Sequence, residues 1–126
     1  MKQIIQTIPD MGPIIDTAIA RLKTQPKTPL SPFAVDTDGT VQLCTAAAVA
    51  AAGFEVRFGP EVAGQFVDRL VEGGTPALYA GYKDLGLPAA LCAEFKARND
   101  GFSAAERSTR AIELLQASPS GVFAAN

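Results

Sequence analysis

The sequence predicts a helix-dominated α+β domain, in which five or six helices pack around one small antiparallel β-hairpin. Apolar residues recur at helical spacing through most of the chain. A single Asp-Gly turn separates two short alternating segments, and a run of alanines follows the second of them. A chain of 126 residues suits one domain, which we assign to residues 1–126, with an ordered core over about 10–118 and a loose C-terminal tail.

The first predicted helix follows Pro9. From Asp10, a suitable N-cap, apolar residues recur at helical spacing as far as Lys23, whose cation favours a helix C-terminus. Residues 2–8 fit either a short strand or a helical turn. Three prolines at three-residue spacing then predict an extended connector over residues 23–32, because proline fixes φ and restricts the residue before it.

A hairpin and an alanine-rich helix form the centre of the predicted fold. Residues 33–44 alternate apolar and polar side chains on either side of an Asp-Gly pair, which is a strong two-residue turn signal. Cys44 or Thr45 then begins a helix that Gly53 ends in a left-handed conformation. Because the side chains of this helix are so small, neighbours can approach its backbone closely, and we expect it at the centre of the core.

The remainder of the chain predicts one more extended segment and four helices. Phe54, Val56 and Phe58 alternate with charged residues and indicate a short strand. Ser103 and Glu106 have the spacing of a capping box, which predicts that the last helix begins at Ser103 and buries Ala105. The four predicted helices cover about residues 60–73, 75–85, 88–98 and 103–118.

Composition argues against several classes of function. The net charge is −2 and the basic residues are spread from Lys2 to Arg110, so the concentrated positive charge of a nucleic-acid binder is absent. Two cysteines cannot make a disulfide framework, and no segment resembles a signal peptide or a membrane span. We therefore expect a soluble cytoplasmic protein that binds neither nucleic acid nor membrane and needs no cofactor.

Cys44 is the first candidate for chemistry. A thiol at a helix N-terminus has its pKa lowered by unsatisfied N–H groups and by the helix dipole. Cysteine hydrolases pair such a thiol with a histidine, and this chain contains none. Two interpretations remain open: a cysteine assisted by a carboxylate or a lysine, and a buried structural thiol among Val41, Leu43 and Val49.

Four charged residues are further candidates. Asp36 and Asp38 match the start of a calcium loop, but the glutamate that would complete it is absent, so we expect an acidic hairpin turn without a metal. Asp100 lies between two predicted helices, where it can cap the second helix or pair with Arg107. If these residues converge around Cys44, a catalytic site becomes the better interpretation.

Two tyrosines are the candidate binding residues. Tyr79 and Tyr82 share a face of their predicted helix with Leu78 and Leu85. An aromatic ring with a polar tip suits the wall of a pocket or a dimer contact. The alternative is core packing, with the hydroxyl groups at the edge of the core.

Three short motifs resemble a family of small bacterial proteins known only as a domain of unknown function. In that family the motifs read Phe-Ala-x-Asp-x-Asp-Gly, Trp-Cys-x-x-Gly-Ala and Trp-Asn-Asp, and they match residues 33–39, 43–48 and 98–100. Leu43 and Arg98 replace the two tryptophans here, and an alanine replaces the glycine. The resemblance covers most of the chain and implies a shape and a set of positions, but no reaction.

The leading prediction is a non-enzymatic module that binds a partner protein or a second copy of itself. It rests on the chemistry that the sequence lacks, since there is no histidine, no phosphate-binding loop and no complete set of metal ligands. One alternative is a histidine-independent cysteine hydrolase or transferase centred on Cys44. The other is a domain that binds a small ligand in an apolar pocket.

Overall fold

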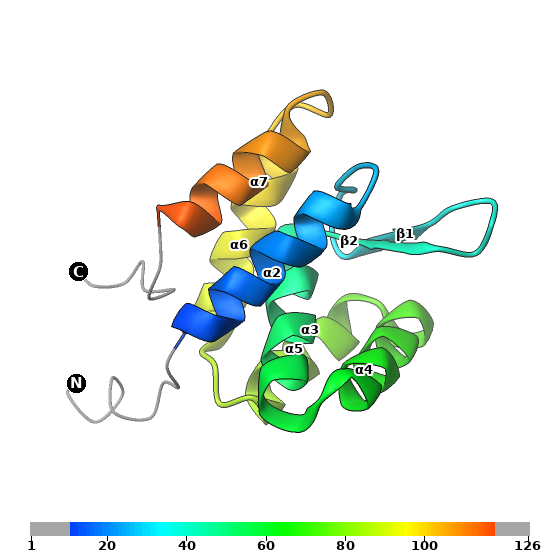
Figure 1. Cartoon of the computed structure of the whole chain (residues 1–126), viewed down its shortest axis with the longest axis vertical. Helices are drawn as coiled ribbons and strands as arrows, with labels where there is room; N and C mark the ends of the chain where they lie inside the picture. The colour runs from blue at the N-terminus through cyan, green and yellow to red at the C-terminus, as the bar shows by residue number, and fades with distance from the viewer. Residues whose placement is uncertain (1–10, 118–126) are drawn as a thin grey trace.

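The computed structural model describes residues 11–117 and confirms a helix-dominated α+β fold (Figure 1). This part of the chain contains six helices and two strands. In chain order they are α2 (Gly12–Thr24), β1 (Phe33–Val35), β2 (Val41–Leu43), α3 (Thr45–Phe58), α4 (Pro60–Gly73), α5 (Thr75–Asp84), α6 (Ala89–Gly101) and α7 (Arg107–Gln116). The predictions for residues 2–8 and for the C-terminal tail lie outside the described residues.

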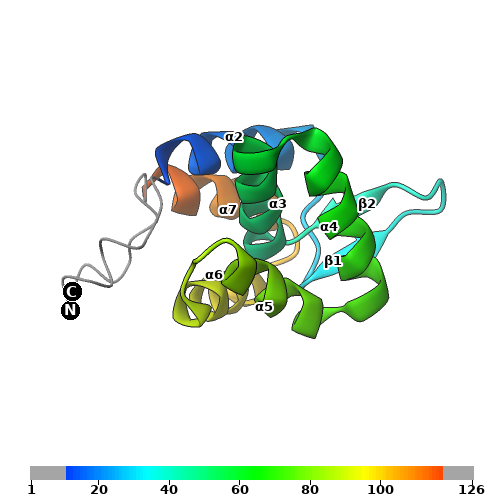
Figure 2. The ribbon, with the colours of Figure 1, turned by 90° about the horizontal axis from the view of Figure 1, so that it is seen from below.

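Helix α3 lies at the centre of the molecule, as its alanines predict. Every residue from Thr45 to Phe54 is buried, and helices α2, α4, α5 and α6 all contact α3. Figure 2 shows α3 in the middle of this arrangement, with the other helices around it. Because the alanine side chains have a single carbon, the surrounding helices can approach the α3 backbone closely. The larger side chains of the core come mostly from the elements that surround α3.

Helix α3 continues past Gly53 to Phe58, so the strand predicted over residues 54–58 is wrong. Gly53 lies inside the helix, where an added Cβ would be 2.7 Å from Leu85 Cδ1. The glycine is explained by this close approach rather than by a helix end. The rings of Phe54 and Phe58 lie one turn apart, with centroids separated by 6.3 Å, as helical residues four apart do.

Helices α2 and α7 pack along each other on one side of the molecule (Figure 1). Met11, rather than Asp10, occupies the N-cap position of α2. The buried residues of α2 are the ones that its periodicity predicts, namely Ile14, Ile15, Ala18 and Leu22. Helix α7 contributes Ala111 and Leu115 to the same core.

The last helix begins at Arg107, after its predicted start at Ser103. The predicted capping box does not form, and Ala105 is exposed rather than buried. Arg107 explains the difference, because its guanidinium binds the carbonyls of Asn99 and Phe102 at the end of α6. These bonds fix the position along the chain at which α7 can begin.

The middle helices follow the predicted pattern closely. Helix α4 begins at Pro60 and α6 begins directly after Pro88, where proline fits the first turn. Thr75 is the first residue of α5 and not its N-cap, because Gly74 takes that position with φ of 68°. Such a φ value is costly for any residue with a Cβ, so this turn requires its glycine.

Strands β1 and β2 form the predicted two-stranded antiparallel hairpin, whose turn extends beyond the helices in both views (Figures 1 and 2). The register places Phe33 opposite Leu43, Ala34 opposite Gln42 and Val35 opposite Val41. The base of the hairpin is buried at Leu43, whereas Val35, nearer the turn, is 50% exposed. The hairpin therefore has one end in the core and one end in solvent.

Candidate functional site

Cys44 joins the hairpin to α3 and is fully buried. It is the N-cap of α3, and its Sγ accepts a hydrogen bond of 3.4 Å from the backbone N–H of Ala47. Its own backbone N–H donates to the carbonyl of Pro32, at 3.0 Å, across the base of the hairpin. The thiol therefore caps a helix inside the core and is not exposed to solvent.

Burial raises the pKa of the Cys44 thiol. The Ser31 hydroxyl and the backbone N–H groups of the first turn of α3 oppose this effect without reversing it, and the Asp100 carboxylate adds to it. Burial, together with the charge on Cys44, raises the pKa of Cys92 to about 12. Both thiols are therefore protonated at neutral pH, and the lowering expected from a helix N-terminus alone does not occur.

Iodoacetamide is expected to leave Cys44 unmodified in the folded protein between pH 5 and 9, and to modify it readily after unfolding in urea. Only the thiolate reacts, and folding keeps this thiol both covered and protonated. Mass spectrometry of the alkylated protein checks the result. Modification of native Cys44 at pH 7 at the rate of a free thiol would instead show a reactive site and favour the cysteine enzyme.

The raised pKa values of the two thiols also predict how stability depends on pH. The fold favours the protonated thiol, so the stabilisation is fully present below the unfolded pKa of 9.0 and is lost as the pH rises above it. The urea midpoint is expected to fall between pH 9 and 12 because the two thiols, and the buried Tyr82 hydroxyl whose pKa is also raised, ionise more readily in the unfolded chain. Replacing Cys92 with alanine should flatten that part of the profile, and an unchanged slope would contradict the assignment.

Asn99 is the buried polar residue that joins three parts of the chain. Its Oδ1 accepts hydrogen bonds from the backbone N–H and the hydroxyl of Thr45, at 3.0 and 2.8 Å. Its Nδ2 donates to the carbonyl of Pro29 at 3.0 Å and to Oδ1 of Asp100 at 2.9 Å. The last turn of α6 thereby holds both the start of α3 and the proline connector. We call Asn99, Asp100 and Arg107 the polar junction.

The other two members of the polar junction also bind backbone groups. Oδ1 of Asp100 accepts a hydrogen bond of 2.9 Å from the N–H of Ser31. Arg107 donates from Nε to the Asn99 carbonyl and from Nη2 to the Phe102 carbonyl, each at 3.1 Å. Asp100 neither caps α7 nor pairs with Arg107, so both predicted roles are wrong. The polar junction does lie against the start of α3, but its side chains form hydrogen bonds with backbone groups of the protein.

Asp36 and Asp38 lie at the turn end of the hairpin, away from its base at Cys44. Oδ2 of Asp36 accepts a hydrogen bond of 2.6 Å from Gln42, and Oδ1 of Asp38 accepts one of 3.0 Å from the N–H of Thr40. The backbone N–H and hydroxyl of Thr40 hold the pKa of Asp38 below its ordinary value. Among residues 11–117, no three His, Cys, Asp or Glu side chains gather closely enough to hold a metal ion.

Gln25, from the proline connector, covers the outer edge of β2. Its Oε1 accepts a hydrogen bond of 2.7 Å from the Leu43 N–H, and its Nε2 donates to the Leu43 carbonyl at 3.1 Å. A primary amide that binds both groups of one residue imitates a neighbouring strand. No sequence pattern indicates this role, because the two residues meet only once the connector has folded back along the hairpin.

Among residues 11–117, nothing covers the outer edge of β1 in this way. Two hydrogen bonds identify the groups that face β2: Cys44 N–H donates to the Pro32 carbonyl, and Asp36 N–H donates to the Thr40 carbonyl. Hydrogen-bonded and non-hydrogen-bonded pairs alternate along an antiparallel ladder. Ala34, midway between these two pairs, therefore directs its own N–H and C=O toward β2.

By the same alternation, Phe33 and Val35 direct their N–H and C=O groups away from β2. Within residues 11–117, no other group forms a hydrogen bond with these four. We call them the open edge. Val35 is also among the exposed large apolar residues of the protein. The hairpin thus presents unpaired main-chain donors and acceptors beside an apolar side chain.

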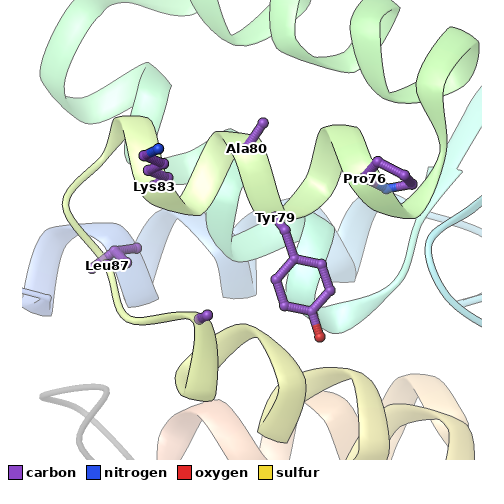
Figure 3. Close-up of a pocket in the computed structure, with 6 residues that line it drawn as sticks. Pro76, Tyr79, Ala80, Lys83 and Leu87 are labelled. Carbon is purple, nitrogen blue, oxygen red and sulfur yellow. The ribbon is translucent and has the colours of Figure 1, made fainter.

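The two candidate tyrosines have different surroundings. Tyr82 is fully buried, donates a hydrogen bond of 2.8 Å to the Ala46 carbonyl in α3, and has its pKa raised well above the ordinary value by that burial. Tyr79 is half-buried and points from α5 toward α6, where it lines a cavity of about 520 Å³ (Figure 3). The other residues that line this cavity are Pro76, Ala80, Lys83, Leu87 and Ala89.

Comparisons of the chain with known protein families, curated proteins and solved structures give no match. The resemblance to the bacterial family of unknown function therefore stays a prediction. None of the helices within residues 11–117 is long and apolar enough to cross a bilayer. The open edge, the polar junction and the cavity beside Tyr79 are thus the features from which a function can be inferred.

Proposed function

We propose that this protein is a non-enzymatic protein-interaction module, which pairs an extended segment of its partner with the open edge of β1. The observation that supports this proposal most strongly is strand β1, whose outward N–H and C=O groups have no hydrogen-bond partner in the described part of the chain. The hairpin that contains β1 extends beyond the helices (Figure 1). In strand addition, main-chain hydrogen bonds supply affinity and neighbouring side chains supply selectivity. Val35, which is 50% exposed, offers such a side chain.

The surroundings of the chemically reactive residues favour this proposal over a cysteine hydrolase or transferase. A nucleophile must be accessible and must have a base within reach. Cys44 is buried and protonated, and the chain has no histidine. The Asp100 carboxylate, which acts on the pKa of Cys44, and the other side chains of the polar junction bind backbone groups and hold the fold together.

We further propose a cytoplasmic protein that does not bind nucleic acid and that belongs to the bacterial family its motifs resemble. The two free thiols and the net charge of −2 support the first two points. The three motifs support the third, since they meet in space. Residues 33–39 form β1 and the turn of the hairpin, residues 43–48 run from the end of β2 into α3, and residues 98–100 hold the start of α3 through Asn99.

Titration of the isotope-labelled full chain with a capped Lys-Val-Thr-Val-Thr-Val-Lys peptide, followed by NMR, tests strand addition. We expect the amide signals of Phe33 and Val35 to shift progressively. The matched control is Val35→Pro, which removes one outward donor and no hairpin bond, because the Val35 N–H faces away from β2. This variant should keep the native spectrum and bind at least tenfold more weakly. Equal binding by both proteins, or shifts confined to other surfaces, would contradict the proposal.

A second candidate function is small-molecule binding between α5 and α6. It is favoured by the cavity beside Tyr79, whose volume of about 520 Å³ lies within the range of ligand pockets. Lys83 at its wall would favour an anionic group on an apolar ligand. Because the chain has no tryptophan, Tyr79→Trp supplies a single fluorophore with which carboxylate ligands can be screened.

A further inference from the structure

We infer that the partner at the open edge is a second copy of this chain, bound so that two β1 strands pair antiparallel about a two-fold axis at Ala34. The two hairpins would then form one four-stranded sheet. This inference rests on the proposed function, since it names the partner for the same edge. It follows from the register of β1, from the side chains of β1, and from the hydrogen bonds by which Gln25 covers the outer edge of β2.

The open edge is complementary to itself. A two-fold axis at Ala34 places Phe33 of each copy opposite Val35 of the other. Both residues direct their N–H and C=O groups outward, so each of these symmetric pairs can exchange two main-chain hydrogen bonds. Pro32, directly before β1, does not interrupt this ladder, because its carbonyl faces β2 and accepts a hydrogen bond from the Cys44 N–H.

The side chains suit the same register. Phe33 opposite Val35 is an aromatic residue facing a β-branched one, which is a favourable cross-strand pair, and the symmetry forms it twice. Ala34 faces Ala34 of the other copy in a non-hydrogen-bonded pair, in which the Cα atoms approach to about 4.5 Å. A small residue at the position of closest approach avoids a clash. Pairing would also cover Val35, which is 50% exposed in the single chain.

The cover on β2 explains why the assembly would stop at two copies. Gln25 already binds the outward N–H and C=O of Leu43, which leaves Val41 as the one β2 residue whose outward groups lack this cover. In the part of the chain that the structure describes, each hairpin therefore has a single edge suited to strand pairing, and an interface in which the same edge meets itself is closed. A two-stranded hairpin is marginally stable alone, and doubling the sheet relieves that weakness.

Cross-linking tests the register directly. In the inferred dimer, Ala34→Cys brings two introduced thiols within disulfide distance, whereas Val35→Cys, on the same strand and more exposed, leaves them about 8 Å apart at the Cα atoms. Under mild oxidation we expect the first variant to form an intermolecular disulfide at least tenfold faster than the second. The native thiols do not compete because both are buried. Equal rates, or a faster reaction of the second variant, would overturn this register.

Equilibrium sedimentation tests the partner. The wild-type chain is expected to show a concentration-dependent monomer–dimer equilibrium, which Val35→Pro and Val35→Lys each weaken at least tenfold while the circular dichroism spectrum stays native. A wild-type monomer at millimolar concentration, or growth into larger oligomers, overturns the inference of a closed dimer. If that monomer still binds the Lys-Val-Thr peptide at Phe33 and Val35, the proposed function stands without this partner. If it does not, both fail.

Discussion

Replacing Asn99 with alanine is expected to lower the free energy of unfolding by about 3 kcal/mol. The Asn99 side chain makes four hydrogen bonds, and its loss leaves the Thr45 N–H and the Pro29 carbonyl without their side-chain partner. A buried polar group left without a hydrogen bond destabilises a protein by about 1–3 kcal/mol, and the substitution leaves two such groups, the Thr45 N–H and the Pro29 carbonyl. Urea unfolding followed by circular dichroism measures the change.

Two further variants separate this effect from a general weakness of the polar junction. Thr45→Val removes only the hydroxyl bond to Asn99 and should cost about 1 kcal/mol. Asp100→Asn keeps an acceptor for the Ser31 N–H at an exposed position and should change stability by less than about 0.5 kcal/mol. If Asn99→Ala costs no more than Asp100→Asn, Asn99 does not hold α3 to the connector.

Replacing Gly81 with alanine is expected to destabilise the protein by about 1–2 kcal/mol, although alanine is the better helix former. An added Cβ in α5 would lie 2.5 Å from Cε1 of Phe66 and 3.1 Å from its Cδ1. Phe66 is fully buried and packs on Phe54, with ring centroids 5.1 Å apart, so its ring has little room to move. Overpacking costs about 1–3 kcal/mol or more, which exceeds the gain of about 1 kcal/mol in helix propensity.

Gly64 provides the matched control for Gly81. It also lies inside a helix, α4, but it is exposed and an added Cβ would meet nothing within 4 Å. Gly64→Ala should therefore show the propensity gain alone and raise the free energy of unfolding by up to about 1 kcal/mol. Thermal or urea unfolding of both variants checks the difference in sign. Stabilisation by both substitutions would mean that α5 and α4 do not approach as closely as the Phe66 contact requires.

Much of the fold could be predicted from the sequence because the deciding signals were local. The apolar periodicity of α2 and α4, the proline that begins α4, the proline directly before α6 and the Asp-Gly turn of the hairpin each act within a few residues. The end of α3 could not be predicted in this way. Gly53 has the local signature of a helix end, but its role depends on Leu85, the residue directly after α5, whose side chain occupies the place that a Cβ on residue 53 would need.

The candidate site was less predictable, because its contacts join distant segments. The sequence indicated a junction at Asp100 and Arg107, but it could not show that backbone carbonyls, rather than each other, would be their partners. A position at a helix N-terminus was expected to lower the pKa of the Cys44 thiol, but burial raises that pKa by more. The role of Gln25 could not be predicted from the sequence, because its amide binds the outer edge of β2 only after the connector has folded back along the hairpin.

Amide hydrogen exchange of β1 in dilute protein is the most direct test of the central claim, which is that the outer edge of this strand is open. We expect the amides of Phe33 and Val35 to exchange at least about a hundredfold faster than that of Ala34, which faces β2. Their exchange should slow as the protein is concentrated or the peptide is added. A Val35 amide as protected as the Ala34 amide in dilute monomer would contradict the claim and leave strand addition without a surface.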